Sequence, residues 1–248
     1  MDKILKHIRS FSSTADFIAN VEREAGRGPF VVSFCNAHAV NLAIVSPIFA
    51  DNLLSSDLLV RDGSGVKIAM QALGMEPGAN LNGTDAIPGL LHEYTKPRLA
   101  LYGTQEPWLG KAAALLAGQK DVVAMVDGFQ DDEFYLLSAK KVRPDIILLA
   151  MGMPKQERIA RLLAKKLDTP CLIINGGAIL DFMAERFNRA PLLMRKVGME
   201  WLYRLLKEPK RLFGRYVIGN AMFLFRLGIA FLKRRGLLWQ RREKPDES

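Results

Sequence analysis

Small and polar residues recur directly after the short apolar runs of this sequence, and together they are suited to bind a nucleotide. Glycines let backbone N–H groups approach phosphates closely, and a helix beginning at such a turn presents further N–H groups. For any one turn, the alternative is that a glycine only ends a strand and begins a helix. The recurrence over six turns favours a nucleotide site. The residues are Asn36 and His38; Asp62, Gly63 and Gly65; Gly103 and Thr104; Asp127 and Gly128; Gly152, Pro154, Lys155 and Gln156; and Gly176 and Gly177.

The apolar runs that precede these residues are predicted to be buried parallel strands, because several are apolar on both faces. The stretches 65–73, 107–117 and 155–166 are long enough to be crossover helices. This alternation predicts an α/β fold, a Rossmann-like and mainly parallel sheet flanked by helices. Ligands of such sheets bind beyond the carboxyl ends of the strands. The predicted strands are 29–35, 57–62, 98–103, 121–126, 145–151 and 170–175.

The sequence lacks the motifs of several other kinds of functional site. The segment DGSGVK, which begins at Asp62, has the wrong spacing for a P-loop or a dinucleotide turn, and no G-x-S-x-G elbow is present. The three histidines are scattered and no His or Cys pair stands at ligand spacing, so we expect no metal and no cofactor. Cys35 and Cys171 lie in strand-like runs, which predicts buried free thiols in a reducing compartment.

The excess positive charge lies toward the C-terminal end. The chain has 248 residues and a net charge of +9, and residues 195–248 hold 14 Lys and Arg against 5 Asp and Glu. The preceding residues are balanced, with 21 basic and 21 acidic side chains. We therefore expect a neutral α/β core, 1–194, and a basic appendage, 195–248, that meets anionic lipid or nucleic acid. The first residues contain no long apolar run, so we expect a cytoplasmic protein.

Four groups of segments resemble the WecG/TagA/CpsF family of bacterial glycosyltransferases. The similarity covers roughly residues 25–220, and its most specific parts are the GxPKQE, NRAP-like and EWLYRLLxEPxR segments. The full set is NAHAVNLA with RDGSGVKIA, NGTD, AMGMPKQE, and GGAILDFMAERFNRAP running into GMEWLYRLLKEPKRLFGRY.

The resemblance implies an inverting enzyme that moves a sugar from a UDP-sugar to a sugar carried on a polyprenyl diphosphate. It implies work at the cytoplasmic face of the membrane, in the synthesis of teichoic acid, common antigen, capsule or exopolysaccharide. It also implies that no divalent metal is needed. The transferred sugar is a hexose or an N-acetylhexosamine, and the sequence leaves an oligomer open.

Asp62 is the candidate catalytic base, because it matches the family's DG-x-G-V aspartate. An inverting transfer needs a carboxylate to take the proton of the attacking hydroxyl. The alternative from the residues alone is that Asp62 caps the helix beginning near Ser64. Asn36 matches the Asn of the family's first motif, which lines the acceptor and base region. Phe34 stands where better-known members often have Thr, so a contact from that hydroxyl is not carried over.

Three further places in the core are candidate substrate contacts. Lys155 and Gln156 stand where a strand ends and a helix begins, which suits a diphosphate, although a solvated first helical turn is the alternative. Thr84 and Asp85 either contact substrate or cap a helix. In the GGAILDF…NRAP stretch, Arg189 is a candidate phosphate contact, and Asp181 either binds substrate or orders the loop.

The resemblance places arginines of the appendage on the donor diphosphate, where they stabilise the leaving group. Arg204 and Arg211 match the EWLYR and EPxR motifs. The next family arginine falls at Gly214 or Arg215, where this chain departs from the pattern.

The distal appendage is predicted to lie in a membrane interface. The apolar run 217–232 has 16 residues, whereas a spanning helix needs about 20. At about 100° per residue, Arg211, Arg215, Arg226 and Lys233 share one side, from which cations would meet lipid head groups. The alternative is a core helix followed by a charged tail.

Other functions are disfavoured by particular features. A nucleotide-dependent oxidoreductase would need the missing dinucleotide fingerprint. A non-enzymatic nucleotide- or nucleic-acid-binding protein using the basic tail remains an alternative, but the tail is mostly aliphatic and lacks interleaved aromatic and basic residues. We therefore expect no nucleic-acid partner. An inactive lipid-binding scaffold is mildly disfavoured by the retained Asp62.

Overall fold

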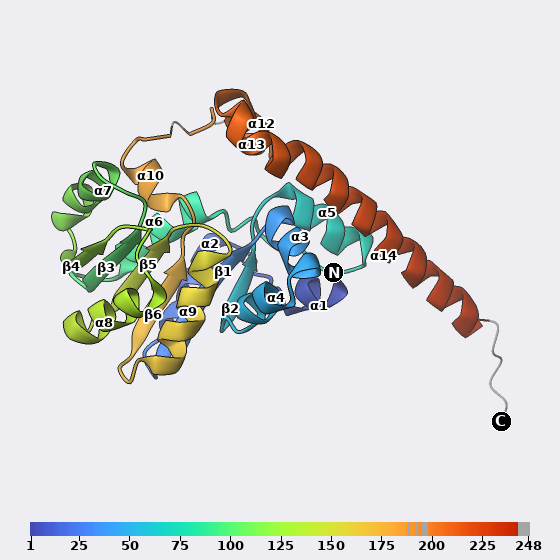
Figure 1. Cartoon of the computed structure of the whole chain (residues 1–248). Helices are drawn as coiled ribbons and strands as arrows, with labels where there is room; N and C mark the ends of the chain where they lie inside the picture. Colours follow the sequence, from blue (N-terminus) through green and yellow to red (C-terminus); the bar gives the residue numbers. More distant parts are fainter. Residues whose placement is uncertain (188, 192, 195–197, 243–248) are drawn as a thin grey trace.

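The computed structural model describes residues 1–187, 189–191, 193–194 and 198–242. Its centre is a parallel sheet with the strand order β2-β1-β6-β5-β3-β4 (Figure 1). All six predicted strands are confirmed, with shifts of one residue at some ends. The strands are β1 (Pro29–Cys35), β2 (Leu58–Arg61), β3 (Arg98–Gly103), β4 (Asp121–Val126), β5 (Ile146–Ala150) and β6 (Cys171–Asn175).

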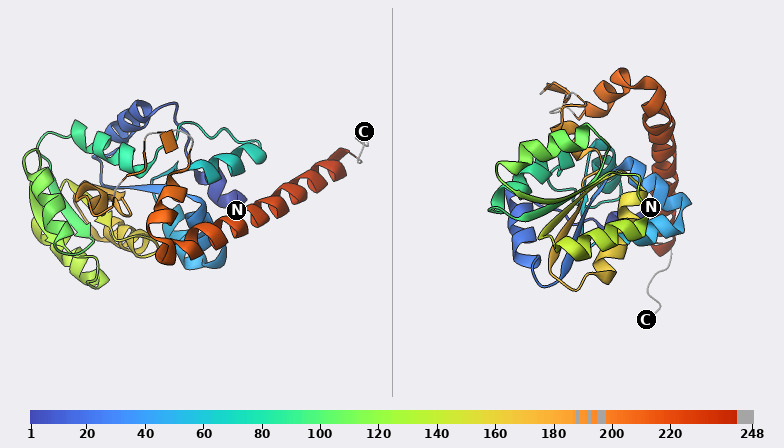
Figure 2. Two further views of the ribbon diagram at one scale, coloured as in Figure 1. Left: turned by 90° about the horizontal axis from the view of Figure 1, so that it is seen from above. Right: turned by 60° about the vertical axis from the view of Figure 1, so that its left-hand side comes forward.

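Helices cover both faces of the sheet, as Figure 2 shows in its right-hand view. Alternate residues of a strand point to opposite faces, and in β1 Phe30, Val32 and Phe34 join one apolar cluster while Val31 and Cys35 join two others. The first face is covered by α2 (Thr14–Glu24), α6 (Gly83–Glu93), α7 (Trp108–Ala117) and α10 (Ile179–Met183). The second face is covered by α1 (Asp2–His7), α3 (Ala37–Val45), α4 (Pro47–Leu54), α5 (Ser64–Ala72), α8 (Asp132–Val142) and α9 (Lys155–Lys166).

The C-terminal segment forms a helical arm that passes over one edge of the body (Figures 1 and 2). Its elements are α12 (Glu200–Lys207), α13 (Pro209–Phe213), the π-helical turn η1 (Gly214–Ile218) and α14 (Gly219–Arg242). The predicted boundary at 194/195 adjoins residues 195–197, which lie outside the described residues, as do 243–248 of the predicted appendage.

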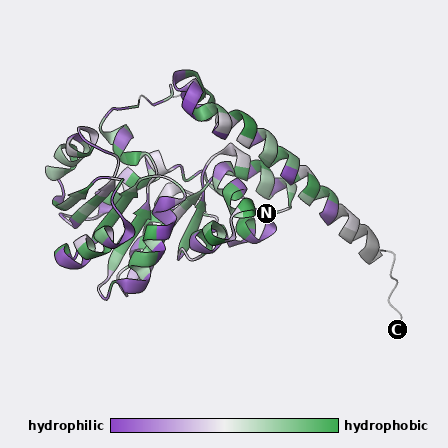
Figure 3. Ribbon diagram, viewed as in Figure 1, coloured by the Kyte–Doolittle hydropathy of each residue, from purple (hydrophilic) through white to green (hydrophobic). Residues whose placement is uncertain are grey.

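The arm is a longer helix than its apolar run indicated. Pro209–Arg234 forms 26 helical residues, and by length and composition this stretch is long and apolar enough to cross a membrane. Gly214, Gly219 and Gly228 do not interrupt it. Apolar residues run along much of α14 in Figure 3.

One face of α14 is fixed to the body. Phe223 and Leu227 are buried in the cluster that includes α3 and α5. The Asn41 amide donates to the Gly219 carbonyl at 2.7 Å, and Arg226 donates back to the Asn41 side-chain oxygen at 2.8 Å. Arg234 donates to the carbonyl of Leu73. The arm is therefore held by a seam of apolar and polar contacts along its inner side.

Candidate functional site

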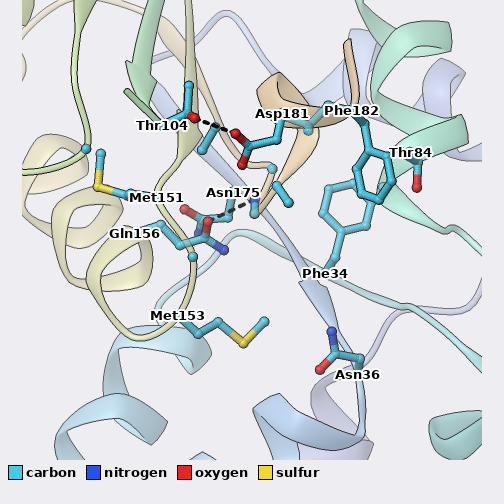
Figure 4. A pocket seen from close by; sticks show the side chains of 18 of the residues that line it. Phe34, Asn36, Thr84, Thr104, Met151, Met153, Gln156, Asn175, Asp181 and Phe182 are labelled. Carbon is cyan, nitrogen blue, oxygen red and sulfur yellow. Dashed lines mark hydrogen bonds between the residues drawn. The ribbon is translucent and has the colours of Figure 1, made fainter. Parts of the chain in front are cut away.

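A cavity of about 420 Å³ opens at the carboxyl ends of the strands, between the α/β body and the arm. Residues that follow all six strands line it, and Figure 4 shows a part of the lining. The pocket brings together fourteen of the residues that the sequence predicted at the site. These are Asn36, His38, Asp62, Thr84, Thr104, Gly128, Gly152, Gln156, Gly176, Gly177, Asp181, Arg204, Arg211 and Arg215.

Asp62 is set between groups that act on its protonation in opposite directions. Burial raises the pKa of Asp62 to about 6, a hydrogen bond from Asn36 lowers it, and the carboxylate of Glu200 raises it again. The positive charges of Arg215 and Arg204 have smaller, lowering effects on the same pKa. A carboxylate with this pKa is a competent proton acceptor near neutral pH.

Asp62 does not cap α5, which was the alternative to its role as a base. The cap position of α5 is Gly63, at φ 87°, and no side chain caps this helix. Asn36 is the residue that caps a helix here, because its side-chain oxygen accepts from the Ala39 N–H at 3.1 Å. That bond leaves the amide N–H groups of Asn36 to face Asp62.

Three arginines of the arm reach back into the pocket. Arg204 comes from α12, Arg211 from α13 and Arg215 from η1. The buried Nε atoms of Arg204 and Arg215 have no hydrogen-bond partner among the residues that the structure describes, and burial lowers the pKa of Arg215. Arg211 is paired with Glu208 at 2.7 Å. Buried guanidinium groups with unused donors favour an anion, which would supply both charge and acceptors.

The expectation that cations on this side of the helix meet lipid head groups is wrong for Arg226, whereas Arg215 lies in the pocket, where the resemblance placed arginines of the appendage. Arg215 lines the pocket and Arg226 is bonded to Asn41, so both point toward the body. The period of the helix gave their shared side correctly. At these two residues the side of the helix that carries the cations faces the body, where Asn41 and the pocket provide a polar environment.

Asp181 orders the loop after β6. It accepts a hydrogen bond from the Thr104 hydroxyl at 2.5 Å, drawn as a dashed line in Figure 4, and pairs with Arg186 at 3.1 Å. These bonds tie the end of β3 to α10. Thr104 and Arg186 both line the pocket; Thr104 belongs to the strand-end set predicted from the sequence, whereas Arg186 had no predicted role.

Gln156 and Glu157 form a buried pair at the start of α9. The Gln156 side-chain oxygen accepts from the Gly177 N–H at 3.0 Å, and its amide donates to Glu157 at 2.9 Å. Glu157 is 1% exposed, and burial raises its pKa to about 7. The pair fixes the turn after β6. Glu157 was visible in the PKQE motif, but burial of its carboxyl group was not.

Lys155 uses its charge on the chain's own backbone. Its ammonium group donates to the carbonyls of Gly128 at 3.0 Å and Gln130 at 2.6 Å, above the ring of Tyr135. In this arrangement it holds the loop after β4 and does not line the pocket.

Seven other predicted residues also lie outside the pocket lining. Gly103 has no room for a side chain, because a Cβ there would meet the backbone of Ala150, so this glycine lets β3 and β5 approach each other closely. Asp85 pairs with Arg189 at 2.8 Å, which links α6 to the segment that leads into the arm. The seven residues are Gly63, Gly65, Asp85, Gly103, Asp127, Pro154 and Arg189.

The cap of α6 is Asn82, not Thr84 or Asp85. Its side-chain oxygen accepts from the Thr84 N–H at 2.8 Å, and its amide donates to Glu200 of the arm at 3.3 Å. Asn82 and Thr84 both line the pocket. The NGTD motif therefore joins the body to the arm at the edge of the pocket.

His38 is a pocket residue that is uncharged at neutral pH. Burial and the nearby charge of Arg215 lower its pKa to about 4. Among the residues that the structure describes, no group of three His, Cys, Asp or Glu side chains is arranged to hold a metal ion. Cys35 and Cys171 are buried free thiols, as predicted.

An α/β sheet with a carboxylate and inward-facing arginines at its strand ends is an arrangement suited to group transfer from an anionic donor. The model of the glycosyl transferase WecG/TagA/CpsF family matches residues 6–237. The chain belongs to this family.

Several relatives carry one name, N-acetylglucosaminyldiphosphoundecaprenol N-acetyl-beta-D-mannosaminyltransferase. One from Bacillus subtilis (strain 168) is 26% identical over 187 residues, 73% of each chain. One from Staphylococcus aureus (strain MW2) is 28% identical over 189 residues, 74% of each chain. One from Bacillus spizizenii is 24% identical over 211 residues, which cover 81% of this chain and 80% of the relative.

Proposed function

We propose that this protein is an inverting glycosyltransferase that moves a hexose or N-acetylhexosamine from a UDP-sugar to a sugar on a polyprenyl diphosphate. The observation that carries the proposal is the position of Asp62 and the arm arginines on one pocket. A base and a cationic site for a leaving diphosphate are the two groups that such a transfer needs when no metal assists. The names of the relatives support a lipid-linked acceptor.

In the proposed reaction, a hydroxyl of the acceptor sugar attacks the anomeric carbon of the donor. Asp62 takes the hydroxyl proton, a new C–O bond forms, and UDP leaves with the electrons of the broken bond. Asn36 orients the Asp62 carboxylate through its amide. Arg204 and Arg215 offer unused buried N–H donors to the diphosphate as its charge grows.

We further propose that the protein is peripheral and works on the cytoplasmic face of the membrane. The outward side of α14 is apolar, and Phe225 and Leu232 are 66% and 69% exposed. A helix spanning the membrane would have to leave the body and bring Arg226 into lipid without Asn41, at a cost of several kcal/mol. If the helix lies flat on the membrane, it keeps its packing against the body and the hydrogen bond between Arg226 and Asn41, and it buries its apolar side in lipid.

The first test is release of UDP from a panel of UDP-sugars, with a short-chain polyprenyl diphosphate sugar as acceptor. UDP-N-acetylmannosamine is the first donor to try, because the relatives' names specify this sugar. We expect release with at least one donor and only in the presence of acceptor. No release with any pair would count against the proposal.

The second test is Asp62→Asn, which removes the base and keeps the shape. Loss of general-base catalysis lowers turnover by about 10²–10⁴-fold. The matched control is Asp51→Asn, which changes an exposed carboxylate on α4 and is expected to leave turnover near the wild-type value. Near-normal turnover of a folded Asp62→Asn protein would remove Asp62 from the mechanism.

A further inference from the structure

A second cavity, of about 890 Å³, lies between α1 and the distal part of α14. It shares no lining residue with the first pocket. We call it the basic groove, because five of its lining side chains are cationic and one, Asp2, is acidic. The five cations are Lys3, Lys6, Arg226, Lys233 and Arg234.

Three of the five cations have no partner among the described residues. The side chains of Lys3, Lys6 and Lys233 are exposed and make no hydrogen bond or ion pair there. Arg226 and Arg234 are held in place by carbonyl and amide oxygens of the body. The groove therefore combines two fixed guanidinium groups with three free ammonium groups, and its net charge favours an anion.

The wall of the groove is apolar and continues onto an exposed surface. Ile44 of α3 and Ile229 and Ala230 of α14 line it. Ile229 is 41% exposed and belongs also to the outward side of α14, where Phe225 and Leu232 are more exposed still. We call the outward side of η1 and α14 the apolar stripe; its exposed large members are Val217, Ile218, Met222, Leu224, Phe225, Ile229 and Leu232.

We propose that the basic groove binds the phosphate headgroup of an anionic phospholipid whose acyl chains lie beside the apolar stripe. A free phosphate would use the cations alone, whereas a lipid uses both the charge and the adjoining apolar surface. The proposal rests on the proposed membrane location and adds a defined site to it. It also assigns a role to α1, which supplies Lys3 and Lys6 and lies outside the catalytic pocket.

The test is cosedimentation of the full chain with vesicles of phosphatidylcholine, alone or mixed with phosphatidylglycerol. Each cation near an anionic membrane contributes about fivefold to binding. The triple variant Lys3→Gln, Lys6→Gln, Lys233→Gln is therefore expected to bind the mixed vesicles about a hundredfold more weakly. Binding to phosphatidylcholine alone, which depends on the apolar stripe, is expected to stay the same.

A matched control removes three exposed cations from the far side of the body, at Lys140, Lys141 and Lys166. This control is expected to keep its affinity for mixed vesicles within threefold or so, because screening weakens distant charges. Equal losses in both triple variants would overturn a specific groove, and so would no loss in the first. Inorganic phosphate that competes fully with the vesicles would indicate a free-anion site and overturn the lipid assignment.

UDP release with the short-chain acceptor separates this proposal from the proposed function. The groove variant is expected to keep that activity, since none of its three positions lines the catalytic pocket. A wild-type chain that binds mixed vesicles but transfers no sugar would contradict the proposed function and would still support lipid binding in the groove. Self-association without any preference for mixed vesicles would overturn the groove and favour a second copy of the chain on this surface.

Discussion

Asp62 is held at a pKa that makes its charge depend on pH within the range where enzymes are assayed. Its pKa of about 6 follows mainly from burial, which disfavours the charged form, and is restrained by the hydrogen bond from Asn36. A base must be deprotonated before it can accept a proton. In its proposed role as the base, Asp62 would be inactive when protonated, and the active fraction would grow as the pH rises.

We expect kcat/KM of the wild-type chain to rise tenfold per pH unit below about 6 and to level off above it. Asn36→Ala removes the hydrogen bond that stabilises the charged form, so the midpoint of this limb is expected to move to higher pH. The measurement is UDP release as a function of pH at low donor concentration. A profile that is flat between pH 5 and 8, or so, would argue against a base of this kind.

Glu157 yields a prediction about stability. Its pKa is raised from an ordinary value of 4.5 to about 7 by burial, so the folded chain binds this proton more tightly than the unfolded chain does. The stabilising contribution is complete below about pH 4.5 and is lost as the pH rises through about 7. Glu157→Gln keeps a neutral side chain at every pH. We expect it to raise the free energy of unfolding at pH 8 by about 1–3 kcal/mol.

Denaturant unfolding at pH 5 and pH 8 checks the Glu157 prediction. At pH 5 the variant and the wild type are expected to differ little, because Glu157 is then largely protonated in the folded chain. Glu133→Gln, on the exposed side of α8, is the matched control and should change neither value much. A variant that is less stable than the wild type at pH 8 would mean that the ionised carboxylate has a partner.

At the scale of elements, Asn41 is the residue on which the arm depends most. Its side chain bonds both to the Gly219 carbonyl and to Arg226, and hydrogen bonds to a charged group are worth about 1.5–3 kcal/mol. Asn41→Ala is expected to loosen α14 while the sheet stays folded. Amide hydrogen exchange is then expected to speed up in α14, and not in β5 or β6.

Gln71→Ala, an exposed change on α5, is the matched control for Asn41→Ala. Because Arg215 lies one turn before α14, loosening is also expected to lower the rate of UDP release. Unchanged exchange of α14 in Asn41→Ala would show that the apolar contacts of Phe223 and Leu227 are sufficient to hold it.

The strands were predictable from sequence, and the arm was only partly so. Runs such as IILLA in β5 are apolar on both faces, and burial inside a parallel sheet is the usual reason for that pattern. The length of the arm was missed because only the apolar run 217–232 was counted, whereas the helical stretch Pro209–Arg234 also includes polar residues on either side of that run. The inward direction of Arg226 was missed because its partner, Asn41, lies 185 residues earlier in the chain. The helical period predicts which residues share one side of a helix, and only the tertiary structure determines what that side contacts.

The pocket was likewise predictable where local sequence placed a residue at a strand end. Asn36 and Asp62 follow strands directly, and Gln156 lies in the first turn of the helix that comes after β5, so a parallel sheet brings the three together. Lys155 stands beside Gln156, yet its ammonium group turns to the loop after β4. The direction of a long side chain depends on acceptors from another element, and neighbouring sequence does not contain them.

At the scale of the whole molecule, the arm would connect the proposed membrane surface to the proposed catalytic pocket. One continuous helical stretch carries Arg215 in the pocket and, farther along, the apolar stripe and three of the five cations of the basic groove, Arg226, Lys233 and Arg234. Binding of the stripe to lipid would therefore orient the pocket toward an acceptor whose polyprenyl chain is in the same membrane. A short-chain acceptor in solution needs no such orientation.

The double variant Ile218→Ser, Phe225→Ser tests this connection, because both side chains lie on the outward side of the arm, 58% and 66% exposed. Burying each in lipid is worth about 1.5–3 kcal/mol, so the variant is expected to bind vesicles at least tenfold more weakly. Transfer to a long-chain acceptor in vesicles should fall in proportion, while transfer to a short-chain acceptor in solution stays near normal. Phe134→Ser, Leu137→Ser on α8 removes two similarly exposed apolar side chains from another face and should change neither. Equal loss with both acceptors would mean that the stripe shapes the pocket itself, and that membrane binding and catalysis are not separable functions of the arm.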